Sequence, residues 1–327
     1  MKLSHQTRTQ RTEHNAIYNN FSFDLYSRIS MAELTAATKN FSPDLIIGAG
    51  RYSLVYKGRV SNGIVVAVKK LKSNEFQGLR EFRVEMETLG KLHHRNILPL
   101  VGYCESDYRL LVFKFMERGN LDQWLHDTSS VGNEKFSYWW FPLSWETRIR
   151  IVRGVANGLS YLHGLKKPIV HRNISASNIL LDYKFEAQIA HFELARRIQS
   201  SCSDSNISTE VAGTMGYLPP EYEGYSVATV KGDVYSFGIL MMEIATGHQP
   251  DSEWQMNGKM IGIADWAIEM VVQNSQMQMV DPNIARKGLM EASVVKYFRI
   301  ACMCITESPR KRPVMTKIVH LLNQILL

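Results

Sequence analysis

Residues 170–182 read VHRNISASNILLD, a polar loop enclosed by two apolar segments. The loop contains His171, Arg172, two serines and two asparagines, and its first carboxylate is Asp182. This composition resembles that of an active-site loop from which the acid has been removed. Taken alone, the segment leaves three interpretations open: a damaged catalytic centre, a catalytic centre kept in a silent form, or a polar turn.

The composition of the whole chain excludes several classes of protein. A chain of 327 residues with 45% apolar and 21% charged residues is typical of a globular protein and is long enough for two lobes. It has no apolar run of about 18 residues and no apolar N-terminal signal, so we expect no membrane insertion. Four scattered cysteines suit a cytoplasmic protein. The net charge of +7 comes from dispersed Lys and Arg residues, so no nucleic-acid partner is predicted.

Upstream of the loop, the sequence has the pattern of a tail, a short helix and a small β-sheet. Residues 1–28 are polar and weakly basic, so we expect a flexible basic tail. The sequence SMAE at residues 30–33 is a capping box that predicts a helix through about Lys39. Residues 45–72 then read as strands and turns, and Asn62-Gly63 between two apolar runs predicts a hairpin.

A carboxylate on the apolar face of a predicted helix indicates a buried ion pair. Residues 76–91 carry apolar side chains three and four positions apart, and Glu85 lies on the same face. A carboxylate directed at a core needs a partner. The alternation of VVAVKK at residues 65–70 puts Lys69 on one face with Ala67, so Lys69 is the predicted partner.

Seven segments occur in the order of the protein kinase subdomains. They are the Gly-rich hairpin, the VAVK strand, the Glu-bearing helix, the HRN loop, IAHFELAR, GTMGYLPPEY and GDVYSFGILMMEIATG. The segments MAELTAATKNFS and LHHRNILPLVGYC are similar to those typical of the plant receptor-like kinase family, which is related to the animal interleukin-1-receptor-associated kinases. The chain resembles a soluble, atypical pseudokinase member of that family over residues 30–327.

The resemblance implies an α+β fold, the two-lobed protein kinase fold, with a small β-rich N-lobe and a larger helical C-lobe. After the tail, residues 29–117 would form the pre-kinase helix and the N-lobe, and residues 118–327 the C-lobe. The kinase-like domain itself would cover residues 45–327.

The resemblance also assigns candidate nucleotide-binding residues. Two glycines of the phosphate loop are retained, whereas Ser53 replaces the third. The remaining positions match the residues that enclose adenine, the Lys–Glu ion pair and the hinge. The candidates are Gly48, Gly50, Val55, Ala67, Lys69, Glu85, Met116 and Leu180.

The positions that carry the chemistry in the family are replaced. Asn173 stands where an aspartate accepts the proton of the substrate hydroxyl, and Ser175 where a lysine neutralises phosphate. In the Asp-Phe-Gly motif, His191 replaces the metal-binding acid, and Glu193 replaces a glycine and removes backbone freedom. Asn178 alone remains of the metal ligands, so we expect a non-functional metal site without magnesium. Loss of the base alone removes about 10²–10⁴ in rate.

Structural positions of the family are retained, which favours a maintained scaffold over random decay. Asp233 matches the buried acid that holds the catalytic-loop backbone, and Glu221 with Arg312 matches an ion pair of the C-lobe. We therefore expect a scaffold or allosteric partner of an active receptor kinase or other signalling protein, recruited by a receptor to the inner face of the plasma membrane. Two alternatives stay open: an atypical but active ATP-dependent serine/threonine kinase, and a nucleotide sensor. ATP binding should be weak, and an empty, collapsed cleft is the other outcome.

Two further segments indicate regulation and partner binding. Ser208 and Thr209 lie where activation-loop phosphosites occur in the family, and Arg172 matches the arginine that pairs with the phosphorylated residue. Residues 136–141 contain five aromatic side chains, which predict an exposed patch for a protein partner. The alternative is that these aromatic side chains cover the C-lobe's own surface.

Overall fold

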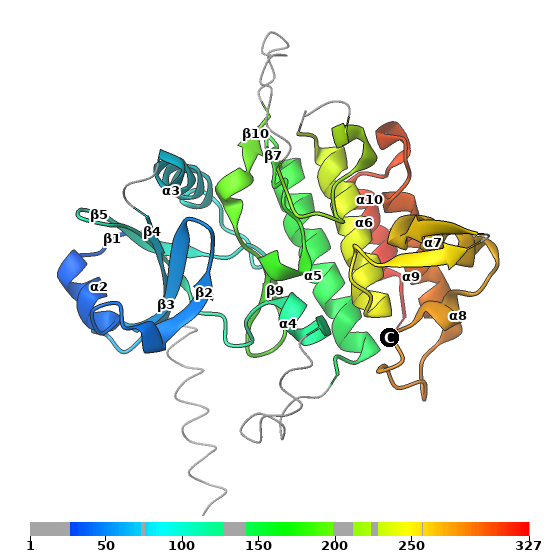
Figure 1. Ribbon diagram of the computed structural model, residues 1–327, viewed down its shortest axis with the longest axis horizontal. Helices are drawn as coiled ribbons and strands as arrows, with labels where there is room; N and C mark the ends of the chain where they lie inside the picture. Colours follow the sequence, from blue (N-terminus) through cyan, green and yellow to red (C-terminus); the bar gives the residue numbers. More distant parts are fainter. Residues whose placement is uncertain are drawn as a thin grey trace, which may run out of the picture.

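The computed structural model describes residues 27–72, 76–126, 142–198, 212–223, 228–256 and 258–326. These residues form a small lobe built on a β-sheet and a larger lobe of helices (Figure 1). The predicted α+β, two-lobed architecture is confirmed.

One mixed sheet forms the small lobe, with the strand order β1-β5-β6-β4-β3-β2. Its strands are β1 (Ser27–Arg28), β2 (Ile46–Ala49), β3 (Ser53–Arg59), β4 (Val65–Leu71), β5 (Leu100–Glu105) and β6 (Arg109–Lys114). Neighbouring strands are antiparallel, except that β1 pairs in parallel with β5. The tail expected through residue 28 therefore extends two residues too far, and residues 1–26 lie outside the described part of the chain.

The β3–β4 hairpin has the alternation that the sequence predicts. Gly63 in its turn has a φ of 85°, a left-handed conformation that glycine adopts without steric cost. Val66 and Val68 pack with Leu34 in a small core on one side of the sheet. Lys69, on the opposite face, lines the cleft between the lobes. Because successive side chains alternate across a strand, this register alone places the lysine in the site.

A short helix before the sheet holds the hairpin turn. Helix α2 (Met31–Ala37) begins at Ser30, whose hydroxyl accepts the Glu33 N–H at 3.2 Å. The Glu33 carboxylate accepts a hydrogen bond from the Ser61 hydroxyl at 2.8 Å, so this acid joins the helix to the β3–β4 turn. The helix ends at Ala37, two residues before the predicted end, because residues 39–41 take left-handed conformations.

Helix α3 (Phe76–Leu89) lies against the sheet and contacts the 3₁₀ turn η4 (Phe192–Leu194) of the large lobe. It ends two residues before the predicted end at Lys91. Phe82 and Leu89 on its apolar face are buried, and Glu85 lies among them. The helix therefore directs one carboxylate from the small lobe toward the large one.

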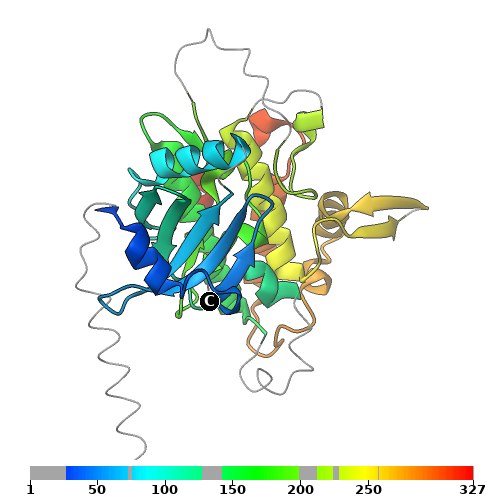
Figure 2. The same cartoon turned by 60° about the vertical axis from the view of Figure 1, so that its left-hand side comes forward.

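Seven α-helices form the described body of the large lobe, with three short antiparallel strand pairs. The helices are α4 (Leu121–His126), α5 (Trp145–Gly164), α6 (Val230–Thr246), α7 (Ile263–Val272), α8 (Gln276–Met279), α9 (Glu291–Cys304) and α10 (Met315–Asn323). The strand pairs are β7 (Ile169–Val170) with β10 (Arg196–Arg197), β8 (Ile179–Leu181) with β9 (Ala187–Ile189), and β11 (Glu253–Met256) with β12 (Lys259–Gly262). The β11–β12 hairpin extends away from the helices (Figure 2).

Helix α6 is the central element of the large lobe, packed against α5, α7 and α9. Fourteen of its residues are buried, which suits a helix that is apolar on nearly every face. Its two buried acids have partners: Asp233 accepts backbone N–H groups of the loop at residues 171–172, and Glu243 pairs with His126 and Tyr217. The central helix thus fixes the position of the polar loop.

Candidate functional site

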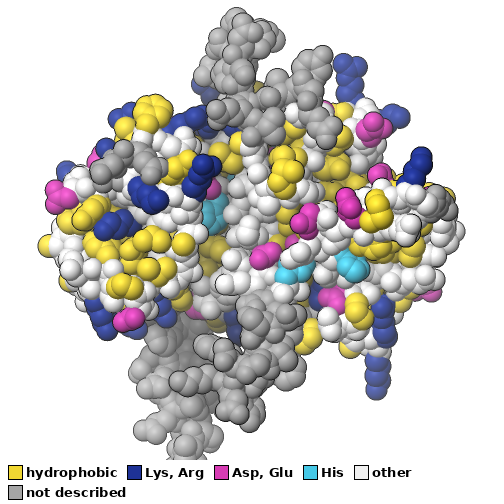
Figure 3. Space-filling model, in the orientation of Figure 1, with side chains coloured by type: hydrophobic (Ala, Val, Ile, Leu, Met, Phe, Trp, Pro, Cys, Tyr) yellow, Lys and Arg dark blue, Asp and Glu magenta, His cyan; other side chains and the backbone are white. Residues whose placement is uncertain are grey.

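A cleft of about 1340 Å³ lies between the two lobes. The space-filling view shows this groove, with a histidine side chain visible inside it (Figure 3). All eight candidate nucleotide-binding residues line it, from Gly48 on β2 and Gly50 in the β2–β3 turn to Leu180 on β8. Asn178 and His191 line it as well, whereas Asn173, Ser175 and Arg172 lie outside its lining.

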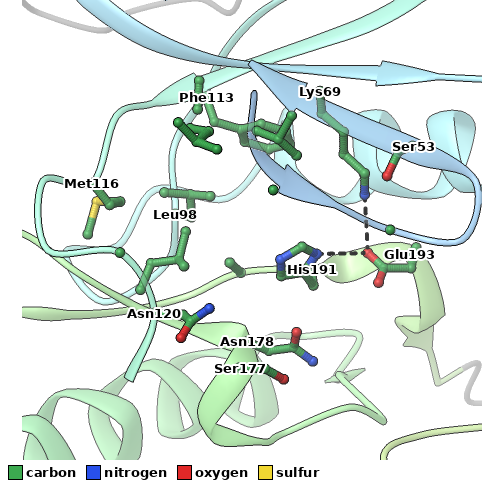
Figure 4. A pocket seen from close by; sticks show the side chains of 18 of the residues that line it. Ser53, Lys69, Leu98, Phe113, Met116, Asn120, Ser177, Asn178, His191 and Glu193 are labelled. Atoms are coloured by element: carbon green, nitrogen blue, oxygen red, sulfur yellow. Dashed lines mark hydrogen bonds and ion pairs between the residues drawn. The ribbon is translucent and has the colours of Figure 1, made fainter. Parts of the chain in front are cut away.

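One end of the cleft is apolar. Its walls include Leu98 and Phe113 beside Met116, and Val55, Ala67 and Leu180 belong to the same lining (Figure 4). Apolar walls of this kind are the environment that aromatic ring systems occupy in binding sites.

The inner end of the cleft is charged. The Lys69 Nζ lies 2.8 Å from Glu85 Oε2 and 3.5 Å from Glu193 Oε2. Glu85 uses its other oxygen to accept the Phe192 N–H at 3.2 Å. His191 Nδ1 lies 3.8 Å from the Glu193 carboxylate (Figure 4). The predicted Lys69–Glu85 pair is therefore present, and a second carboxylate joins it.

Burial and charge act in opposite directions on these groups. Burial disfavours the ammonium form of Lys69, but the Glu85 and Glu193 carboxylates outweigh it and raise the pKa. Burial raises the pKa of Glu85, and Lys69 opposes that shift. For Glu193, burial acts to raise the pKa, but the charge of Lys69, the contribution of His191 and hydrogen bonds together outweigh it and lower the pKa to about 2. Burial lowers the pKa of His191 to about 4, so the imidazole is neutral at pH 7.

The polar loop keeps its backbone framework without the acid. Asp233 accepts the His171 and Arg172 N–H groups at 2.8 Å each. The Asn173 Oδ1 accepts a hydrogen bond from the Thr214 hydroxyl at 2.7 Å, and its carbonyl oxygen accepts one from Asn178 at 2.8 Å. An amide nitrogen or oxygen has no useful proton affinity at pH 7, so Asn173 can position groups but cannot itself accept a proton as a general base.

The predicted ion pair between Glu221 and Arg312 in the C-lobe is also formed. Arg312 donates two hydrogen bonds to the Glu221 carboxylate, each of 2.7 Å, and its side chain is fully buried. The same guanidinium donates to the carbonyls of Lys231, Thr306 and Glu307. A planar guanidinium satisfied in this way is a structural anchor.

The cleft does not fit magnesium, which prefers a near-octahedral set of oxygen ligands. At the position of the first acid stands the neutral imidazole of His191. Glu85, His191 and Glu193 have ligand atoms within 4.8 Å of one another. However, the Lys69 ammonium lies within 3.5 Å of both carboxylates and would repel a cation there.

Sequence reasoning missed two residues of the site. Glu193 was interpreted only as a loss of backbone freedom, but its side chain enters the cleft and pairs with Lys69. Its φ is outside the left-handed region, so the position does not require glycine here. The available signal was the replacement of a glycine by an acid in a motif that the family places close to Lys69 in space. Thr214, in GTMGY, had no local signal, because its partner Asn173 is 41 positions away.

Ser208, Thr209 and the aromatic residues at 136–141 lie outside the described residues. Arg172, the predicted phosphate partner, is described and lies near two other arginines. Burial and then the like charge of Arg80 lower the pKa of Arg196, with a further contribution from Arg172. Three guanidinium groups on α3, the polar loop and β10 thus form a basic cluster.

A sheet lobe over a helical lobe, a Lys–Glu pair in the cleft between them and an acid on the central helix holding the loop define a protein kinase domain. A family model for protein tyrosine and serine/threonine kinases matches residues 43–322. The chain belongs to this family, as a kinase domain of the plant receptor-like kinase type. Domains of this family are generally ATP-binding.

The curated relatives are similar over nearly the whole chain. The leucine-rich repeat receptor protein kinase EMS1 of Arabidopsis thaliana is 41% identical over 303 residues, covering 91% of this chain and 24% of that protein. Phytosulfokine receptor 2 of the same species is 39% identical, covering 91% of this chain and 28% of the receptor. A probable receptor-like serine/threonine-protein kinase of Arabidopsis thaliana is 40% identical, covering 90% of this chain and 65% of its own length. The chain thus spans about a quarter of the two receptors' length.

Within the described residues, every helix is too short or too polar to cross a membrane.

Proposed function

We propose that this kinase domain is a pseudokinase that works as a signalling scaffold or allosteric partner of an active receptor kinase. The observation that carries the proposal is the identity and the hydrogen bonding of Asn173. Its amide oxygen accepts a hydrogen bond from Thr214 at 2.7 Å, where the reaction needs a carboxylate that takes a proton.

The other changes act in the same direction. Phosphoryl transfer depends on positioning and on neutralising the charge of the phosphates. Ser175 brings no charge, and its hydroxyl lies 3.0 Å from that of Ser177. His191 offers a neutral ring in place of a hard anionic ligand. Loss of the base alone costs about 3–5 kcal/mol of barrier, and these losses come in addition.

Membership of the family supports the partner and the location that we propose. EMS1 and phytosulfokine receptor 2 are named as receptors. A domain of this type without its own catalysis would bind an active receptor kinase or another signalling protein, in the cytoplasm at the inner face of the plasma membrane. ATP would bind weakly and without help from magnesium.

One observation favours the alternative of an atypical, active serine/threonine kinase. The Lys69–Glu85 pair is intact at 2.8 Å, and Glu193 brings a carboxylate into the cleft two residues after His191. If this carboxylate could leave Lys69, it could serve as a displaced metal ligand.

Transfer of radiolabel from ATP to a generic basic protein, with magnesium or manganese, separates the two functions. The wild-type chain should transfer no more label than the Asn178→Ala variant. Wild-type transfer that disappears in Lys69→Ala would overturn the pseudokinase proposal, because a contaminating kinase would not respond to that substitution.

A further inference from the structure

Lys69 is the cation at the inner end of the cleft, and its charge is already matched inside the protein. Its ammonium lies 2.8 Å from Glu85 and 3.5 Å from Glu193. Glu85 is fixed from both sides, since its second oxygen accepts the Phe192 N–H. Glu193 comes from the η4 turn and reaches the ammonium from the cleft side (Figure 4). An incoming anion that would pair with Lys69 therefore finds the Glu193 carboxylate already beside the ammonium.

The surroundings of Glu193 give a phosphate no other strong support at this end. His191, 3.8 Å from Glu193, is neutral at pH 7. The remaining cations of the described cleft lining are Arg51, on the β2–β3 turn, and Lys114 and Arg118, on either side of Met116. Like charges a few ångströms apart repel strongly where water is partly excluded. Phosphate groups are thus disfavoured at the inner end.

The apolar end of the cleft has no such obstacle. Val55, Ala67 and Leu180 line it together with the backbone around Met116. A flat heteroaromatic ring gains contact area there and can form hydrogen bonds with backbone groups. The two ends therefore favour different parts of a nucleotide.

We propose that Glu193 acts as a built-in anion beside Lys69, so that the cleft binds uncharged heteroaromatic ligands of the nucleoside type in preference to nucleoside phosphates. Glu193 is then a specificity-determining residue of this cleft. The inference rests on the proposed function, because a kinase that used ATP would need Lys69 for the phosphates. It also explains why retention of the Lys69–Glu85 pair does not require retention of phosphate binding.

Isothermal titration calorimetry with adenosine, ADP and ATP in the presence of a metal chelator tests the proposal. The wild-type chain should bind adenosine at least as tightly as ATP. Glu193→Gln, which keeps the shape and removes the charge, should tighten ATP binding about tenfold while adenosine changes by less than about twofold. Glu193→Gly should also lower the ratio of the dissociation constant for ATP to that for adenosine. This second variant separates the effect of charge from a packing effect of glutamine.

Glu87→Gln is the matched control, because Glu87 is an exposed acid on the same helix as Glu85 and lies outside the cleft lining. It removes the same charge and should leave the ratio of the two dissociation constants unchanged. Circular dichroism melting should show each variant folded at the temperature of the titration.

Three results would overturn the inference: tighter binding of ATP than of adenosine by the wild type, a ratio that does not respond to Glu193→Gln, or no binding of adenosine by any variant. Tight, magnesium-dependent ATP binding that is lost in Glu193→Gln would also contradict it, since Glu193 would then be a metal ligand. Phosphoryl transfer by the wild type would reject the proposed function itself. An unchanged ratio without transfer would reject only the present inference.

Discussion

The side-chain oxygen of Asn173 accepts a hydrogen bond from the hydroxyl of Thr214 over 2.7 Å. This bond joins the polar loop to the segment at residues 212–223, while Asp233 accepts hydrogen bonds from the loop backbone. The geometry of a catalytic loop is therefore preserved around a group that cannot accept a proton. In the proposed pseudokinase, the residue that lacks the acid is thus also one that holds the shape of the loop.

The first prediction concerns the introduction of an acid at position 173. Asn173→Asp alone should not produce autophosphorylation in magnesium or manganese, because the metal position and the phosphate-neutralising position stay changed. Simultaneous Asn173→Asp, Ser175→Lys, His191→Asp and Glu193→Gly substitutions should produce measurable transfer. Incorporation of radiolabelled phosphate checks both variants. Activity from the single reversion would show that the rest of the site is competent and that our interpretation of His191 is wrong.

The second prediction concerns pH. Burial acts to raise the pKa of Glu193, but Lys69, His191 and hydrogen bonds together lower it to about 2 in the folded chain, below its ordinary value of 4.5. The folded state therefore binds fewer protons than the unfolded state between these values, and the stabilisation is present above pH 4.5 and lost as the pH falls toward 2. We expect the free energy of unfolding of the wild type to fall by about 1–3 kcal/mol more than that of Glu193→Gln between pH 6 and 3. Urea denaturation at each pH measures this difference. Parallel curves for the two proteins would show that Glu193 is not paired in solution.

Most of the site's framework was predictable, because it depends on local periodicity. Alternation along VVAVKK and the three-and-four spacing of the following helix suffice to bring Lys69 and Glu85 together. The direction of Glu193 was not predictable in this way. It depends on a left-handed His191, with φ of 64°, and on α3 packing against η4. Neither the rare backbone conformation nor the contact between the lobes produces a periodic pattern of residues in the sequence.

The short-range signals had a similar limit. The capping box located the start of α2 at Ser30, since that interaction spans only three residues. The end of the helix was misplaced, because three successive left-handed residues before Ser42 have no recognisable turn motif. Likewise, residues 27–28 join the sheet only through pairing with β5, some 75 positions away along the chain.

The third prediction concerns the anchor between Glu221 and Arg312. Glu221→Gln should lower the free energy of unfolding by about 3 kcal/mol, because it leaves a fully buried guanidinium without its counter-charge. Glu253→Gln, at an exposed position of β11, is the control and should stay within about 0.5 kcal/mol of the wild type. Guanidinium chloride denaturation monitored by tryptophan fluorescence gives both values. Equal values for the two variants would mean that the three backbone carbonyls bound by Arg312 suffice to stabilise it.

The last prediction concerns regulation by an active partner. Arg80, Arg172 and Arg196 form a basic cluster whose like charges oppose one another, so a doubly charged phosphate nearby would be attracted and would relieve the repulsion. If a receptor kinase of the family phosphorylates Ser208 or Thr209 in trans, the modified chain should melt about 2 °C or more above the unmodified one. Arg196→Gln should reduce this gain, whereas Arg150→Gln, at an exposed position on α5, should not. We choose Arg196 over Arg172 because Arg172 has a φ of 72°, and any substitution there also acts on a strained backbone. Mass-spectrometric mapping with thermal melting of each variant is the measurement. If the loop is phosphorylated and the melting temperature stays unchanged, the basic cluster does not bind the phosphate of the loop.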